Sequence, residues 1–279
     1  MKRYLLAHDL GTSGNKAVLF DTQTLSIVGD CTEVYQTYYP QDGFAEHNPE
    51  QWWQAVCTAT KKLLTGTGIS AADIAAVSFS AIMNTCLPVD KNGKPLCNAV
   101  IWADQRGAEQ LNKLYSAADE NTFYTTTGHR INGTYSIAKM LWLQAHKPEI
   151  FGAAYKFLQV KDFIIHKMTG SFISDYSDAS HMGCLNRNTK RYWSELLERL
   201  NIPEEKLPDL KKSTDTAGTL TSDAAEECGL IAGIPVIVGG GDGCCATAGA
   251  GVYKTGSAYN ALGTSSWNGT LSKTPLADP

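Results

Sequence analysis

The sequence predicts an α/β fold, and three features of the chain support this prediction. Short apolar, β-prone runs alternate with segments whose apolar residues recur at helical spacing. Several of the runs end at glycine-rich connections, for example at residues 11–14 and 239–243. No low-complexity linker interrupts the 279 residues. Strands followed by helices in this order are typical of an α/β architecture.

The first segments predict a β-hairpin followed by a third strand. Residues 4–9 and 16–21 are compact apolar runs, and the sequence Gly-Thr-Ser-Gly at residues 11–14 connects them. Residues 26–35 supply the third β-prone run.

A helix is predicted directly after these strands. Asn48 provides an N-cap, Pro49 suits the first helical position, and Glu50 places an acid in the first turn. Apolar residues then continue at helical spacing, at positions 52, 53, 56, 59, 63 and 64. We assign Trp52 and Trp53 to core packing and give them no catalytic role.

The remaining elements follow the same alternation. The expected elements are a buried strand at 74–80, a strand at 85–89 that enters a hairpin turn at 91–94, mainly helical chain at 104–200, a strand at 235–238, a turn at 239–243 and a helix of small residues at 244–251.

Composition narrows the class of protein. Lys and Arg number 24 against 28 Asp and Glu, and 43% of residues are apolar, which excludes a disordered chain, a coiled coil and a collagen-like repeat. The formal charge of −4, with no basic run, argues against a nucleic-acid or anionic-membrane partner. The eight cysteines contain no CxxC pair, so neither a zinc site nor a disulfide scaffold is indicated.

No membrane or export segment is expected. The first apolar run is too short for a signal peptide, and the longest one, residues 230–238, is far shorter than the roughly 20 residues of a membrane span. We therefore expect a cytoplasmic protein.

A short motif occurs twice in the chain. Leu-Gly-Thr-Ser at residues 10–13 recurs at residues 262–265, each time after an apolar run. Such a turn presents successive backbone N–H groups and two hydroxyls in a concave bend, which suits a phosphate chain where Lys and Arg are scarce. Two such hairpins facing each other would hold a nucleoside triphosphate between two domains, although a match of four common residues also arises by chance.

Several longer motifs occur in a fixed order. They are DLGTSGNKAVLFD at 9–21, EHNPEQWWQA at 46–55, NAVIWADQR at 98–106, KDFIIHKMTG at 161–170, SDYSDAS at 174–180, AGTLT at 217–221 and GGGDG at 239–243. Together they resemble the FGGY carbohydrate kinases, with xylulokinase and gluconokinase relatives nearest, within the actin-like ATPase (ribonuclease H-like) superfamily.

The resemblance implies a mixed β-sheet flanked by helices, with the start of a second, duplicated domain. Residues 1–250 would form the sugar-binding domain, and residues 251–279 the first strands of the ATP-binding domain. On this basis we expect the chain to be the N-terminal portion of a longer kinase.

ATP and Mg²⁺ are the cofactors that the resemblance implies. Asp9 would be a Mg²⁺ ligand, and Lys16 would correspond to the cation that relatives place near the transferred group. An Asp at the end of a buried strand is costly to desolvate unless it meets a cation or donors, although Asp9 could also simply start the turn. Lys16 could likewise be only a solvated cation. The expected phosphate-binding residues are Gly11, Thr12, Ser13, Gly263, Thr264 and Ser265.

Asp242 is the expected catalytic residue. It lies in Gly-Gly-Gly-Asp-Gly between a strand and a helix, and the resemblance makes it the general base that accepts the proton of the attacking sugar hydroxyl. We also expect it beside the metal, with Asp9. The structural alternative is a helix N-cap, and one residue can serve both purposes. His8 is assigned to core packing inside the first strand.

The sugar pocket is expected to contain Met83, Asn84, Trp102, Asp104, Tyr135, Asp242 and Gly243. Relatives of the xylulokinase type carry Met-His where this chain has Met83-Asn84, and Asn where it has Gly243. Both departures fall at positions that contact sugar in the family. Trp102 could stack on the substrate or belong to the core.

The implied activity is transfer of the γ-phosphoryl group of ATP to a hydroxyl of a xylulose-like ketopentose or a gluconate-like sugar acid. The partner would be a small sugar, and the oligomeric state stays open, with a homodimer as one arrangement. The alternative from another class is a non-catalytic sugar-binding or regulatory fragment that lacks the adenine-binding half. A chaperone-like or filament-forming ATPase is disfavoured by the sugar-pocket segments.

Overall fold

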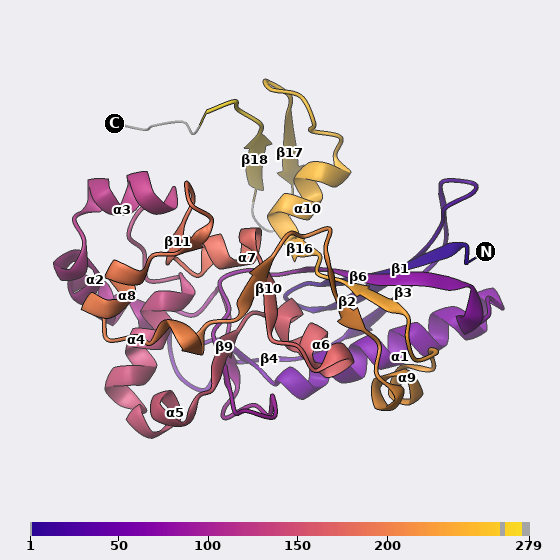
Figure 1. Cartoon of the computed structure of the whole chain (residues 1–279), viewed down its shortest axis with the longest axis horizontal. Helices are drawn as coiled ribbons and strands as arrows, with labels where there is room; N and C mark the ends of the chain where they lie inside the picture. The colour runs from indigo at the N-terminus through magenta and orange to yellow at the C-terminus, as the bar shows by residue number, and fades with distance from the viewer. Residues whose placement is uncertain (1, 263–265, 275–279) are drawn as a thin grey trace.

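A mixed sheet of seven strands organises the chain, whose computed structural model describes residues 2–262 and 266–274 (Figure 1). The strand order is β14-β15-β6-β1-β2-β3, and β16 also pairs with β6. β1 runs parallel to β6, and β15 and β16 are also parallel to β6, whereas β1–β2, β2–β3 and β14–β15 are antiparallel. The strands are β1 Tyr4–Leu10, β2 Gly14–Asp21, β3 Ser26–Val34, β6 Ile74–Ala81, β14 Thr216–Thr219, β15 Pro235–Ile237 and β16 Gly240–Gly241. The predicted α/β fold with a mixed sheet is confirmed.

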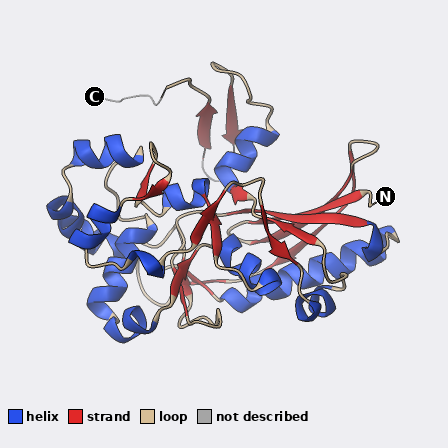
Figure 2. Ribbon diagram, in the orientation of Figure 1, coloured by secondary structure: helices blue, strands red, loops and turns tan. Residues whose placement is uncertain are grey.

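Three helices cover one face of this sheet (Figure 2). They are α1 Pro49–Thr67, α6 Val160–Thr169 and α9 Ser222–Cys228. Side chains alternate along a strand, so Leu6, His8 and Leu10 of β1 point into the core beneath these helices and are buried.

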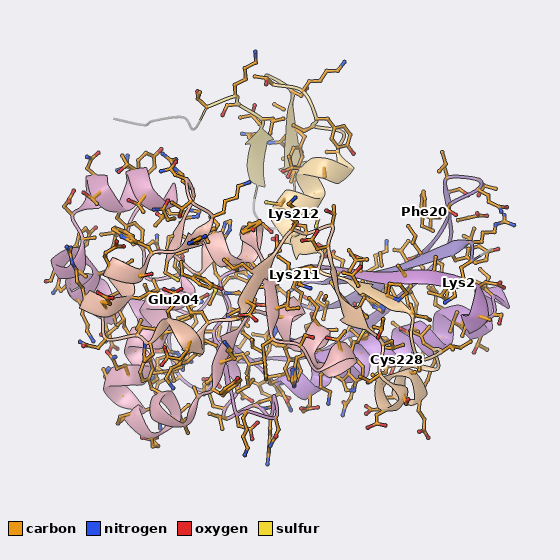
Figure 3. The ribbon with its side chains drawn as sticks, in the orientation of Figure 1. Lys2, Phe20, Glu204, Lys211, Lys212 and Cys228 are labelled. Carbon is orange, nitrogen blue, oxygen red and sulfur yellow. The ribbon has the colours of Figure 1, made fainter. Side chains whose placement is uncertain are left out.

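The opposite face is largely uncovered around the first hairpin. Leu5 is 38% and Ile27 63% exposed, and both lie in register with Phe20 across the three strands. Figure 3 labels Phe20 on these strands and Cys228 at the end of α9, next to α1, on the covered side.

The predicted helix is confirmed as α1. The Asn48 side chain accepts a hydrogen bond from the Glu50 N–H at 3.0 Å, Pro49 opens the helix, and Gly68 ends it in the left-handed conformation. Trp52 and Trp53 are buried in the core, as predicted.

A second apolar core lies among the helices between residues 111 and 200. These helices are α2 Leu111–Ala117, α3 Glu120–Thr127, α4 Ser136–His146, α5 Pro148–Ala153, α7 Tyr176–His181 and α8 Ser194–Arg199. Short strands pair around them as β4 Thr37–Tyr38 with β5 Glu46–His47 and β8 Ala99–Val100, β7 Leu87–Val89 with β9 Lys156–Leu158, β10 Ile173–Asp175 with β13 Asp209–Lys211, and β11 Leu185–Asn186 with β12 Arg191–Tyr192. Short 3₁₀ helices span Ala71–Asp73, Arg106–Gln110 and Glu204–Lys206.

Two local predictions need correction. The strand predicted at 85–89 is shorter, Leu87–Val89, and pairs with the distant β9, whereas the predicted turn after it is present at residues 90–94 and is followed by a bridge between Val89 and Pro95. The connection predicted as a turn at 239–243 contains the two-residue strand β16, which lies against the end of β6.

The end of the described chain forms helix α10 Asp242–Gly249 and the antiparallel pair β17 Ala258–Leu262 and β18 Ser266–Thr270, which project from the rest of the molecule in Figure 1. Both copies of the repeated motif thus follow the first strand of an antiparallel pair, β1–β2 and β17–β18. The predicted phosphate-binding residues Gly263, Thr264 and Ser265 lie outside the described residues. Across residues 2–262 and 266–274, no helix has the length and apolar character needed to cross a membrane.

Candidate active site

Asp9 and Asp242 lie at the same edge of the main sheet. In the sheet register Asp9 of β1 is opposite Ser80 of β6, and Ser80 is opposite Gly240 of β16. Asp242 follows two residues later, at the start of α10. Because β1, β6 and β16 are parallel, their carboxyl ends meet, and the topology brings together two carboxylates that are 233 residues apart in the sequence.

The Asp242 carboxylate is half-buried, and its surroundings disfavour its negative charge. Burial raises its pKa above the ordinary range, and the nearby charge of Asp9 raises it further, whereas the hydrogen bond from the Gly243 N–H to Oδ1, at 2.7 Å, lowers it. Gly241 holds the N-cap position of α10, so Asp242 is the first helical residue and not the cap. The structural alternative considered for Asp242 is therefore wrong.

Asp9 corrects one argument from the sequence. Its side chain is exposed, so the expected desolvation cost does not arise, because alternate residues of β1 face away from the core. Its carboxylate takes part in no hydrogen bond or ion pair within the described chain, and remains available to a cation. Lys16 lies directly opposite on β2, where its Nζ is 3.6 Å from Asp30 Oδ2, and both of these side chains are 55% exposed.

The turn after Asp9 meets the predicted sugar segment. The Gly11 N–H donates to Gly14 O at 2.9 Å and closes the turn, and the Tyr35 hydroxyl donates to Gly11 O at 2.5 Å. The Trp102 indole Nε1–H donates to Thr12 Oγ1 at 2.9 Å, and Trp102 is 45% exposed. The alternative that Trp102 is a core residue is therefore wrong.

Glycine is required where β16 approaches its neighbours. Gly239 has φ +72°, and a Cβ there would lie 2.0 Å from Phe79 O. A Cβ on Gly241 would lie 2.2 Å from Met83 Sδ. The missing side chain of Gly239 therefore lets the segment approach β6, and that of Gly241 lets Met83 pack directly against the residues before Asp242.

Asn84 has two unusual properties for a residue in a connecting loop. Its φ is 61°, in the left-handed region, and its Oδ1 is buried without a hydrogen-bond partner within the described chain. The Lys139 ammonium donates to Asn84 O at 2.5 Å and to Ile101 O at 2.7 Å, so one side chain supports two predicted sugar segments. Burial lowers the pKa of Lys139 to about 7. The sequence analysis missed Lys139, because a single lysine in a helix is expected to point into solvent, whereas Lys139 is fully buried.

Asp104 is held in a buried hydrogen-bonded cluster, and its predicted contact with the sugar stays a prediction. Asp104 is fully buried, and its two oxygens accept four hydrogen bonds, one from the Ala45 N–H and three from the backbone and guanidinium N–H groups of Arg106, at 2.7–2.9 Å. Arg106 also donates to Glu46 Oε1 at 2.7 Å and lies over the Phe44 ring at 3.8 Å. This Arg106 cluster (Glu46, Asp104, Arg106) supports the Trp102 segment, and a sugar would have to displace one of its bonds to reach Asp104.

Tyr135 contacts two imidazoles that the sequence analysis did not select. Its hydroxyl lies 3.2 Å from His129 Nδ1, and its ring centroid 6.5 Å from that of His181. Burial lowers the pKa of His129 to about 4. His181 directly follows the SDYSDAS motif and acts electrostatically on Asp242, so its position beside that motif was the available signal. The assignment of His8 to the core is confirmed, because it is 1% exposed and burial lowers its pKa to about 4.

The comparisons with known proteins decide the family. Residues 4–249 match the FGGY family of carbohydrate kinases, N-terminal domain. The chain belongs to this family.

Named FGGY-type relatives extend the match. The chain is 30% identical to a xylulose kinase of Bacillus subtilis over 94% of its own length and 52% of the relative, and 32% identical to a glycerol kinase of Thermococcus gammatolerans over 96% and 54%. The crystal structure of gluconate kinase from Lactobacillus acidophilus superposes with a TM-score of 0.88 at 27% identity, covering 94% of this chain and 53% of that one. The chain thus spans about half the length of the relatives it matches.

The residues present fit the metal that the FGGY family implies. Within residues 2–262 and 266–274, no three His, Cys, Asp or Glu side chains gather as a metal-binding group. Mg²⁺ at phosphoryl-transfer sites needs fewer protein ligands, since it keeps several waters and is bound by one or two carboxylates together with substrate phosphates. The exposed carboxylate of Asp9, with Asp242 beside it, meets that requirement.

Proposed function

We propose that this chain supplies the sugar-binding half of an ATP-dependent carbohydrate kinase in which Asp242 is the general base. The substrate would be a xylulose-like ketopentose or a gluconate-like sugar acid, and the transferred group the γ-phosphoryl of ATP. The observation that carries the proposal is the meeting of Asp9 and Asp242 at the ends of β1 and β16, with the pKa of Asp242 raised. A base poised nearer neutral pH accepts a proton more effectively than an ordinary carboxylate.

The two carboxylates would have different tasks. Asp242 accepts the proton of the sugar hydroxyl while the hydroxyl oxygen bonds to the γ-phosphorus and ADP leaves. Asp9, together with Asp242, would hold Mg²⁺, which neutralises charge on the phosphates. The turn at Gly11, Thr12 and Ser13 supplies backbone N–H groups and hydroxyls to the phosphates, and Lys16 a cation on the same exposed strand face as Asp9.

The sugar would bind between Asp242 and the predicted pocket residues of the Met83-Asn84, Trp102 and Tyr135 segments. Met83 contacts Gly241, and the side-chain amide oxygen Oδ1 of Asn84 is buried without a partner in the described chain. Trp102 and Tyr135 provide partly exposed rings. Gly243 leaves space where a side chain would otherwise stand. A sugar hydroxyl donating to Asn84 Oδ1 would satisfy an acceptor whose burial otherwise costs free energy.

The domain assignment remains part of the proposal. Residues 1–250 would form the sugar-binding domain, and β17 and β18 would begin the ATP-binding domain, to which the predicted phosphate-binding residues 263–265 would also belong. The proposal predicts that residues 1–279 alone bind ATP weakly. Calorimetry with ATP and Mg²⁺ tests it, and micromolar affinity with normal turnover would contradict this division.

Two substitutions in the full-length protein test the mechanism. Asp242→Asn keeps the size of the side chain but cannot take the proton, so kcat should fall by about 10² to 10⁴ while sugar binding changes little. Asp9→Asn should be partly rescued by excess Mg²⁺, and Asp242→Asn should not. A near-normal kcat with only a raised sugar KM in Asp242→Asn would make it a binding contact. Sugar binding without turnover by the unsubstituted protein would favour the non-catalytic alternative.

A further inference from the structure

Four charged side chains lie fully buried beneath β16. Lys161 Nζ is 2.9 Å from Asp162 Oδ1, 3.0 Å from Asp175 Oδ1 and 3.0 Å from Asp178 Oδ2, and all four side chains are 0% exposed. They form the Lys161 cluster (Lys161, Asp162, Asp175, Asp178). Its members come from the KDFIIHKMTG and SDYSDAS motifs, which the proposed mechanism does not use.

One hydroxyl connects this cluster to the backbone before Asp242. The Ser177 hydroxyl donates to Asp175 Oδ2 at 2.6 Å, and its oxygen accepts the Gly241 N–H at 2.8 Å. Asp175 in turn holds Ser177 through a second bond, from the Ser177 N–H to the same oxygen at 2.9 Å. A continuous path therefore runs from Lys161 through Asp175 and Ser177 to the peptide that precedes Asp242.

Gly241 is held in two ways, by its pairing with Ala81 of β6 and by the hydrogen bond from its N–H to Ser177. Met83 packs on one side of Gly241, and Asp178 Oδ1 lies 3.4 Å from where its Cβ would be. The carboxylate of Asp242 itself bonds only to the adjacent Gly243 N–H among the described residues, a contact that moves with the helix. The orientation of the Asp242 backbone therefore depends on how Gly241 is fixed.

We propose that Ser177 is a positioning residue, which transmits the rigidity of the buried Lys161 cluster to Gly241 and so fixes the Asp242 carboxylate for phosphoryl transfer. The proposal rests on the proposed role of Asp242 as base. A charged network in a dry interior resists displacement, because moving one member leaves a buried charge uncompensated. Small misplacement of a catalytic group costs rate more than affinity, since binding tolerates a geometry that proton transfer does not.

The test compares two serines that bond to the same carboxylate oxygen. Ser213 Oγ also donates to Asp175 Oδ2, at 2.8 Å, but makes no hydrogen bond to Gly241. In the full-length protein we expect Ser177→Ala to lower kcat about 5- to 10-fold with the sugar KM within about twofold, and Ser213→Ala to leave kcat within about twofold. Thermal unfolding of both variants controls for stability.

A second measurement does not depend on activity. Hydrogen exchange of the Gly241 amide should be faster in Ser177→Ala than in the parent and unchanged in Ser213→Ala. Equal kcat for Ser177→Ala and parent, or equal losses in both serine variants, would overturn the proposal, as would an unchanged Gly241 exchange rate. If Asp242→Asn kept its kcat, the assigned base would be wrong, and the exchange rates would still decide whether Ser177 holds Gly241.

Discussion

In the Arg106 cluster one guanidinium serves two carboxylates, whereas in the Lys161 cluster one ammonium faces three. Every oxygen of Asp104 accepts a hydrogen bond, and Arg106 is further covered by Phe44 and Trp142. The oxygens of Asp178 have no hydrogen-bond partner within the described chain, although Lys161 lies 3.0 Å away as an ion pair.

The difference follows from the geometry of the two cations. A planar guanidinium donates two parallel bonds to one carboxylate, whereas an ammonium is a point charge with three protons. The three carboxyl groups of the Lys161 cluster therefore share one cation in a fully buried place. The Arg106 cluster, whose hydrogen bonds are complete, holds the Trp102 segment in place. The Lys161 cluster, whose charges are incompletely paired, lies beneath the segment that leads to the proposed base Asp242, and functional sites are where such perturbed groups are expected.

Removing the cation of the incomplete cluster should have the largest effect. Lys161→Met leaves the buried carboxyl groups of Asp162, Asp175 and Asp178 without their only cation among the described residues, so we expect the free energy of unfolding to fall by about 3–5 kcal/mol. Urea unfolding measures it. The control is Lys167→Met on the same helix, where Nζ lies 3.6 Å from the partly exposed Glu50 and the loss should stay below about 1 kcal/mol. Equal losses in the two variants would contradict the comparison.

Exchanging the cation type of the completed cluster should cost less. Arg106→Lys removes the fork to Asp104 and the stacking on Phe44 and leaves each buried Asp104 oxygen with a single backbone hydrogen bond, so we expect a loss of about 1–3 kcal/mol. The shift in Tm of this variant measures the loss. Arg130→Lys, at a surface pair 3.7 Å from Glu120, is the matched control. A neutral effect at Arg106 would show that its hydrogen-bond geometry is unimportant.

The third effect is a pH dependence from Asp178, which accumulates only as the pH changes. Burial, reinforced by the charges of Asp162 and Asp175 and opposed by Lys161, raises the pKa of Asp178 to about 8. The native state then keeps a proton that the unfolded chain releases above pH ~4, so this contribution to stability is present at low pH and lost as pH rises toward 8.

Asp178→Asn should remove that loss. Relative to the parent, the variant should gain stability from pH 5 to pH 8, by at most about 1.4 kcal/mol per pH unit. Urea unfolding at several pH values tests this, with the exposed Asp223→Asn as control. Parallel curves for parent and Asp178→Asn would mean that Asp178 is ionised throughout.

Local patterns predicted the elements with strong end signals. Asn48, Pro49 and the apolar spacing defined α1, and the two β-prone runs around Gly11 defined the first hairpin, because cap and turn chemistry act over a few residues. Motif resemblance supplied the family. The burial of Asp104 had no signal in the motif, because it depends on hydrogen bonds from Ala45 and Arg106 that only the fold brings together.

No local sequence pattern predicted the buried charged residues that lie beneath the candidate site. Lys161 and Asp178 are 17 residues apart, on a helix and a separate short helix, and only the packing of α6 and α7 beneath β16 makes them neighbours. The exposure of Asp9 also depends on the fold, because an apolar run in the sequence does not show which face of the strand is packed beneath helices and which face is open to solvent.

The hydrogen bond between Trp102 and Thr12 makes the fluorescence of Trp102 sensitive to the candidate site. The indole is partly in solvent, and its N–H is attached to the turn proposed to bind phosphates, whereas Trp52 and Trp53 are sealed in the core. A phosphate that accepts a hydrogen bond from the Thr12 hydroxyl polarises the oxygen to which the Trp102 N–H donates, and a sugar against the ring changes the polarity around the indole. Emission should therefore report occupancy of either proposed subsite without a label, and Trp102→Phe should silence that response.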